Sequence, residues 1–133
     1  MEPDYILEWF RYADMDLLTA QRNTAFYPVH IQMVCFHCQQ SVEKYLKGYL
    51  LYCERIDPPK IHNLDFLCGK CAAFDSRFDE IYDKCEVLAT YGVLPRYPNE
   101  IHVEEQHMKK ALEYAQQIAE FEPLLAVRRE LEK

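Results

Sequence analysis

The chain has 133 residues, half of them hydrophobic and only 3 of them glycine. This length suits one domain with a single core and is too short for two, so we expect one domain over residues 1–133 with its core at about 5–122. A formal net charge of −7 excludes a surface built for indiscriminate binding of nucleic-acid phosphates, which requires broad positive potential. Any contact with nucleotide or RNA is therefore expected to be local.

The sequence contains no apolar run near the roughly 20 residues that a membrane helix needs, so we expect no membrane partner. The N-terminal stretch MEPDYILEWFRYAD lacks the basic start and the small-residue cleavage site of a signal peptide. These two observations predict a cytoplasmic protein whose 6 cysteines stay reduced.

The first predicted helix covers residues 3–23. Apolar side chains recur there every three or four positions, which places them on one helical face: Ile6, Phe10, Ala13, Leu17 and Ala20. Tyr27 and Pro28 then interrupt the pattern and separate this helix from the next.

The second predicted helix, about residues 29–55, has two different sides. The core side consists of Ile31, Cys35, Cys38, Val42, Tyr45, Tyr49 and Tyr52. At about 100° per residue, the opposite side gathers Gln40, Glu43, Lys44 and Lys47. Phe36 and Leu51 project in nearly the same direction as these polar residues, which a fully solvated face does not favour. We therefore expect this side to meet a pocket or another chain; the alternative is a solvated face with a stabilising Glu43–Lys47 pair.

Three further helices and a tail complete the expected fold. Asn63 is predicted to cap a third helix that runs to about residue 74, and a fourth helix is expected over residues 76–90. Asn99 is predicted to cap a last long helix that ends before Pro123, and the tail LLAVRRELEK to form one more short helix. The apolar stripes predict an all-α, up-and-down antiparallel bundle of four to five helices.

The cysteines form two C-x-x-C pairs, Cys35/Cys38 and Cys68/Cys71, which raises the alternative of a zinc or redox protein. The separation of the pairs exceeds the roughly 15 to 20 residues of a zinc ribbon, and the first pair lies in a helical pattern. A thioredoxin-like pair needs a preceding strand, and no strand pattern occurs. We expect these cysteines to pack as small apolar residues, with no metal and no cofactor bound.

Two segments together resemble the HEPN domain family. CFHCQQSVEKYLKGYLLYCERIDPPKIHNLDFL is similar to the family's helix with Gln-Gln and Glu-Lys, followed by a proline-containing loop and a His-Asn-Leu helix start. RYPNE resembles its later Arg-Tyr-Pro-Asp segment. The resemblance spans roughly residues 5–120 and implies a helical bundle that is commonly a homodimer. Family members serve as nucleotide-binding modules or as ribonucleases of toxin–antitoxin and defence systems, often encoded beside a minimal nucleotidyltransferase.

The resemblance makes Arg96 and His102 the candidate catalytic pair. Ribonucleolytic HEPN proteins carry an arginine followed four to six residues later by a histidine, and this pair fits that count. Without any metal, a histidine can take the 2′-hydroxyl proton while an arginine stabilises the charged transition state. With Asn99 as the cap, His102 is expected in the first turn of a helix, where a neutral imidazole and bound anions are favoured. Such members usually place a small polar residue after the arginine, whereas Tyr97 follows Arg96 here.

A second set of residues is expected to bind nucleotide or phosphate. Lys44, Lys47 and Arg96 supply positive charge, His62 precedes a predicted cap, and Tyr97 can stack a base. The alternative is that these residues are structural or solvated.

The function classes therefore stay open. One is a HEPN module that binds a nucleotide, RNA phosphate or a partner such as a nucleotidyltransferase. The other is a metal-independent endoribonuclease of the toxin or defence type that uses Arg96 and His102. We expect a homodimer in either class, because large apolar side chains beside a polar stripe suggest an interface.

Overall fold

The computed structural model describes residues 2–93 and 102–133. These residues form helices and no strand, which confirms the predicted all-α bundle. The elements are α1 (Pro3–Asn23), α2 (Ile31–Glu54), α3 (Leu64–Ala72), the 3-10 helix η1 (Ser76–Ile81), α4 (Tyr82–Ala89), α5 (Glu105–Ala119) and α6 (Glu122–Leu131). The described residues thus form one α-helix more than the upper limit of the prediction, which was four to five helices. The additional helix is α6, which the tail forms.

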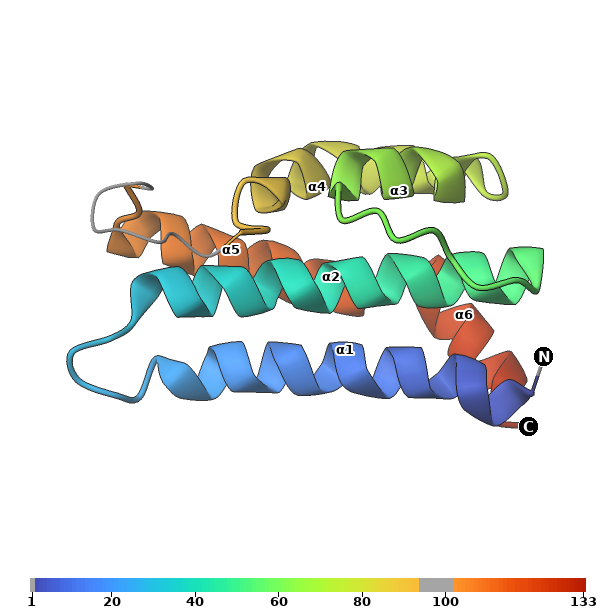
Figure 1. The fold of residues 1–133 in the computed structure, drawn as a ribbon, viewed down its shortest axis with the longest axis horizontal. Helices are drawn as coiled ribbons and strands as arrows, with labels where there is room; N and C mark the ends of the chain where they lie inside the picture. Colours follow the sequence, from blue (N-terminus) through green and yellow to red (C-terminus); the bar gives the residue numbers. More distant parts are fainter. Residues whose placement is uncertain (1, 94–101) are drawn as a thin grey trace.

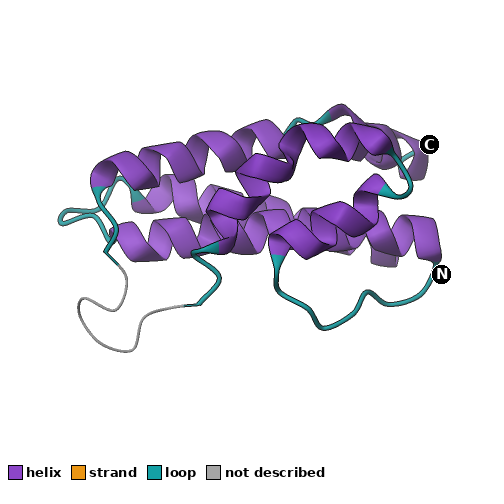
Figure 2. Cartoon of the chain, turned by 90° about the horizontal axis from the view of Figure 1, so that it is seen from above, coloured by secondary structure: helices purple, strands orange, loops and turns teal. Residues whose placement is uncertain are grey.

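Helix α2 is the central element of the bundle (Figure 1). It lies antiparallel to α1 along the long axis, and α5 and α3 also pack against it. Helices α3 and α4 form a layer on one side of α2, and α1 lies on the other (Figure 1). The N- and C-termini lie at the same end, opposite the α1–α2 connection (Figures 1 and 2).

The bounds of α1 agree with the prediction. Pro3 occupies the first turn, where its missing N–H costs nothing. The five stripe residues predicted from the spacing are all buried against the rest of the bundle. Gly48 of α2 lets α1 come close at this interface, because a Cβ there would lie 3.2 Å from Cβ of Trp9.

The environment of α2 corrects one prediction. Leu51 was expected to project with the polar residues, away from the core, but it is fully buried, whereas Phe36 is half-buried. Helical spacing alone assigns each helix one buried face, but α2 is enclosed by neighbours on several sides. An interface built on both Phe36 and Leu51 is therefore excluded.

The predicted start of α3 is confirmed, since the Asn63 side chain accepts a hydrogen bond from the amide of Asp65 at 3.1 Å. The predicted helix over 76–90 is divided into η1 and α4. In η1 the buried side chains of Phe78 and Ile81 are three residues apart, the spacing that a 3-10 helix aligns on one side.

Helix α5 begins at Glu105 and not at the predicted Asn99, which lies outside the described residues. Glu104 and His107 form a reciprocal capping box in which the Glu104 amide donates to Nδ1 of His107 at 2.9 Å. Consequently His102 precedes the helix and does not lie in its first turn, so the expected effect of the helix dipole on this imidazole is wrong.

Pro123 lies in the first turn of α6, where it starts this helix as well as following α5. Helix α6 is fastened to α1 by Arg128, whose Nη1 and Nη2 donate to the Asp14 carboxylate at 3.0 and 2.7 Å. No helix in the described ranges has both the length and the apolar character required to cross a membrane.

Candidate functional site

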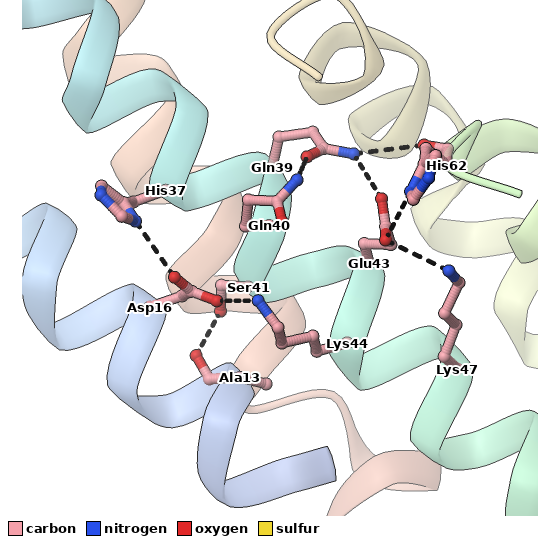
Figure 3. A network of polar contacts seen from close by, with 10 residues as sticks. All are labelled: Ala13, Asp16, His37, Gln39, Gln40, Ser41, Glu43, Lys44, Lys47 and His62. Carbon is pink, nitrogen blue, oxygen red and sulfur yellow. Dashed lines mark hydrogen bonds and ion pairs between the residues drawn. The ribbon is translucent and has the colours of Figure 1, made fainter. Parts of the chain in front are cut away.

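An ionic cluster built on the buried Glu43 and Lys47, with the exposed His62 beside them, occupies the polar side of α2 (Figure 3). The Glu43 carboxylate pairs with Lys47 Nζ at 3.2 Å and with Nδ1 of His62 at 3.0 Å. It also accepts a hydrogen bond from the Gln39 side-chain amide at 3.1 Å, and that amide donates to the His62 carbonyl at 3.2 Å. The loop before α3 is thereby tied to the middle of α2. We call Gln39, Glu43, Lys47 and His62 the Glu43 cluster.

The charged groups at the centre of this cluster are buried, so the loss of either one is expected to destabilise the fold. Glu43 and Lys47 are only 6% and 5% exposed. Burial raises the pKa of Glu43, but the hydrogen bonds from His62 and Gln39 and the charge of Lys47 together hold the pKa below its ordinary value. The carboxylate is therefore charged and compensated inside the protein.

A second ionic cluster lies between α1 and α2. The Asp16 carboxylate binds Nζ of Lys44 and lies 3.0 Å from Nδ1 of His37 (Figure 3). Beside it, the hydroxyl of Ser41 donates to the Ala13 carbonyl at 2.8 Å. These contacts cross-link the two long helices.

The structure therefore separates the cations that were expected to hold phosphate. Lys47 and His62 share Glu43, whereas Lys44 pairs with Asp16 on another helix. Both lysines are matched by carboxylates of the same chain, so a phosphate would have to compete with an internal ion pair at either position.

The candidate catalytic pair lies only partly within the described residues. Arg96 and Tyr97 fall outside them. His102 is highly exposed, with 81% of its side chain accessible, and its Nε2 lies 3.0 Å from Oε1 of Glu104. A carboxylate beside one ring nitrogen can orient an imidazole whose other nitrogen faces solvent.

The two C-x-x-C pairs lie in the core, as the packing interpretation predicts. Cys35 and Cys38 on α2 and Cys68 and Cys71 on α3 are fully buried. Burial raises the pKa of the Cys35 thiol to about 11 and that of Cys38 to about 12, which disfavours the thiolate that metals and redox chemistry require. In residues 2–93 and 102–133, no group of three or more His, Cys, Asp or Glu side chains could hold a metal ion.

Two features were not anticipated from the sequence. One is the bond from the buried Tyr45 hydroxyl to Asp14, which also holds Arg128. The other is a groove along α1 lined by Tyr5, Glu8, Trp9, Tyr12 and Lys44. The spacing of the α1 residues at three and four positions was the available signal, since it defines a second stripe beside the core stripe.

These observations define an all-helical bundle whose central helix carries a buried Gln-Glu-Lys cluster tied to a His-Asn helix start. The HEPN domain family model matches residues 6–125, and the chain belongs to this family. A comparison with curated proteins gave no match.

Proposed function

We propose that this HEPN domain is a partner-binding module in which Lys44 and Lys47 are structural and do not hold a phosphate. The observation that carries the proposal is the pairing of both lysines with buried or half-buried carboxylates of their own chain. Removal of Lys47 or Lys44 would leave its carboxylate poorly solvated and without a counter-charge. The main role of these two lysines is therefore to stabilise the fold.

The surface proposed for a partner is the open side of α2. Four of the half-buried side chains of α2 are spaced three or four residues apart and therefore share one side of the helix: Met33, Phe36, Gln40 and Lys44. Met33 and Phe36 keep apolar surface in contact with water, and a second copy of the chain would cover it. The first partner we propose is therefore another protomer, and a minimal nucleotidyltransferase is the second.

The test compares two binding events on purified protein. Light scattering at tens of micromolar measures self-association, and calorimetry with ATP measures phosphate binding by the wild type and by Lys44→Gln. We expect a dimer, and no difference in ATP binding between the two proteins. A monomeric wild type whose ATP affinity falls in Lys44→Gln would favour the nucleotide-binding function.

The second candidate is the metal-independent endoribonuclease. The observation that favours it is the exposed His102 with its Glu104 carboxylate, an arrangement suited to a general base. Arg96 would supply the charge that stabilises the transition state. Cleavage of labelled RNA in EDTA tests this candidate.

A further inference from the structure

The groove along α1, defined above by Tyr5, Glu8, Trp9, Tyr12 and Lys44, has a volume of about 400 Å³. Its aromatic side chains are only partly used by the core: Tyr5 is 43% and Tyr12 55% exposed, and Trp9 is half-buried against the core. A smaller hollow of about 270 Å³ continues it and shares Tyr12 and Lys44. We call the first hollow the α1 groove.

Two of the three aromatic side chains of the α1 groove contact other parts of the bundle. The Tyr5 hydroxyl donates to Oδ1 of Asp57 at 2.9 Å, which joins the start of α1 to the loop after α2. Trp9 packs where Gly48 allows α1 to approach α2 closely. Because these contacts hold Tyr5 and Trp9, a ligand would lose little side-chain freedom in ordering these two rings.

The charge left over in the α1 groove is negative. Its cation, Lys44, is bound by Asp16. Glu8 pairs with Arg11 at 2.8 Å, but both side chains are about half exposed, so this pair is weak and can exchange partners. Asp57 does not line the groove, but it is exposed and accepts the hydroxyl of the lining residue Tyr5. The groove therefore offers one exposed lining carboxylate, that of Glu8, beside three aromatic rings, and the exposed Asp57 lies next to Tyr5.

We infer that the α1 groove binds an arginine side chain presented by a basic segment of a partner protein. Aromatic faces attract a guanidinium, and a carboxylate at the edge of the ring can accept its N–H groups. Charge complementarity favours this occupant, because Glu8 lines the groove, Lys44 is bound by Asp16, and the chain as a whole is acidic, with a net charge of −7. The inference deepens the partner-binding function and rests on it.

The same rings could stack a nucleobase, but the charges oppose this occupant. A nucleotide would bring its phosphate to a groove that is lined by Glu8 and whose lysine, Lys44, is already bound by Asp16. Repulsion between Glu8 and the phosphate opposes this stacking, most strongly at low ionic strength.

The fluorescence of Trp9 gives a direct test, because this is the 1 tryptophan in the chain. The probe is a short peptide with arginines separated by glycines, titrated at low salt into the full-length protein. The comparison probes are the same peptide with glutamine for arginine, and oligouridine RNA. We expect a saturable change in emission with the arginine peptide alone, weakened by added salt.

Two groove variants and two matched controls locate the binding. Glu8→Gln and Tyr12→Ala each change an exposed groove residue and should weaken peptide binding about threefold or more. Tyr27→Ala, at a fully exposed tyrosine of the α1–α2 connection, and Glu86→Gln, at an exposed glutamate of α4, should leave it unchanged. Circular dichroism first establishes that each variant is folded.

Several results would overturn the inference: no response to the arginine peptide, an equal response to the glutamine peptide, or a response to RNA alone. Equal weakening by the groove and control variants would also overturn it. Loss of self-association in Tyr12→Ala would show that a second protomer occupies the groove. Binding is also measured with Phe36→Glu, so failure of the proposed dimer and failure of the groove remain distinguishable.

Discussion

Lys47 Nζ lies 3.2 Å from Oε2 of Glu43, one helical turn earlier on α2, and both side chains are buried. Such a pair on an exposed helix contributes only a few tenths of a kcal/mol. Here both charged groups are largely withdrawn from water, and Gln39 and the exposed His62 complete the carboxylate's hydrogen bonds. Removal of one charge from the Glu43 cluster should therefore lower the free energy of unfolding substantially.

We predict that Glu43→Ala destabilises the fold by about 3 kcal/mol or more, because Lys47 would remain buried without a counter-charge. Urea unfolding followed by circular dichroism measures the loss. Glu105→Ala is the matched control: Glu105 also pairs with a lysine four residues later, Lys109, but both side chains are exposed. The control should lose less than about 1 kcal/mol, and equal losses in the two variants would show that burial of the cluster adds nothing.

The pH dependence of stability should carry the signature of Glu43. The pKa of Glu43 in the folded state lies below its ordinary value near 4.5, so the folded protein binds fewer protons than the unfolded chain between the two values. The stabilisation is complete above the unfolded-state pKa and is lost as pH falls through the folded-state pKa. In thermal unfolding from pH 7 to pH 3, the wild type and Glu43→Gln should therefore converge toward acid pH. A gap that stays constant would assign the stabilisation to other groups.

Much of this fold follows from local sequence. Helix α1 was predicted with its observed bounds because Pro3 starts it and a regular apolar stripe runs through it. The burial of Glu43 and Leu51 could not be predicted in the same way, since it depends on the loop before α3 and on the several neighbours of α2. The start of α5 was misplaced because Asn99 is a common cap residue, whereas the observed cap uses the less common Glu104–His107 pair.

In the candidate site, contacts within one helix could be predicted from the sequence, whereas contacts between helices could not. Spacing on α2 brought Glu43 and Lys47 together correctly, because both belong to one helix. It could not show that Asp16, on α1, takes Lys44, since that contact depends on how two helices pack. The α1 groove was missed for the same reason: its shape depends on the closeness of the helices at Gly48.

If the proposed homodimer forms, Phe36→Glu should shift it toward monomer. Phe36 is half-buried on the open side of α2, so a carboxylate there would be desolvated in an interface but tolerated in a monomer. Phe66→Glu, at a half-exposed phenylalanine of α3, controls for added charge and should leave the dimer intact. Light scattering across a concentration series gives the measurement. A wild type that is monomeric at tens of micromolar would exclude this interface.

The cysteines should behave as core residues. Five are buried and Cys53 alone is half-buried, so a thiol reagent should label at most Cys53 quickly in the native protein and all 6 cysteines after denaturation. A chelator should leave the melting temperature unchanged. About one equivalent of tightly bound zinc, with unfolding upon chelation, would instead establish a metal-dependent fold.

The segment RYPNEIH decides between the two proposed functions. If the protein is a ribonuclease with His102 as general base, His102→Ala should reduce RNA cleavage in EDTA roughly 100-fold or more while RNA binding stays nearly intact. Arg96→Lys keeps the charge but loses the planar fork, so it should also lower activity if Arg96 recognises phosphate. Glu104→Gln is an informative third variant, because it removes the charge beside Nε2 of His102 while keeping a hydrogen-bonding side chain in the α5 cap. A smaller decrease in cleavage, with a shifted pH profile, would show that Glu104 orients the base. Wild-type cleavage that survives the Arg96 and His102 substitutions would exclude this segment as the active site, and the absence of cleavage by folded wild type would leave the partner-binding function that the paired lysines favour.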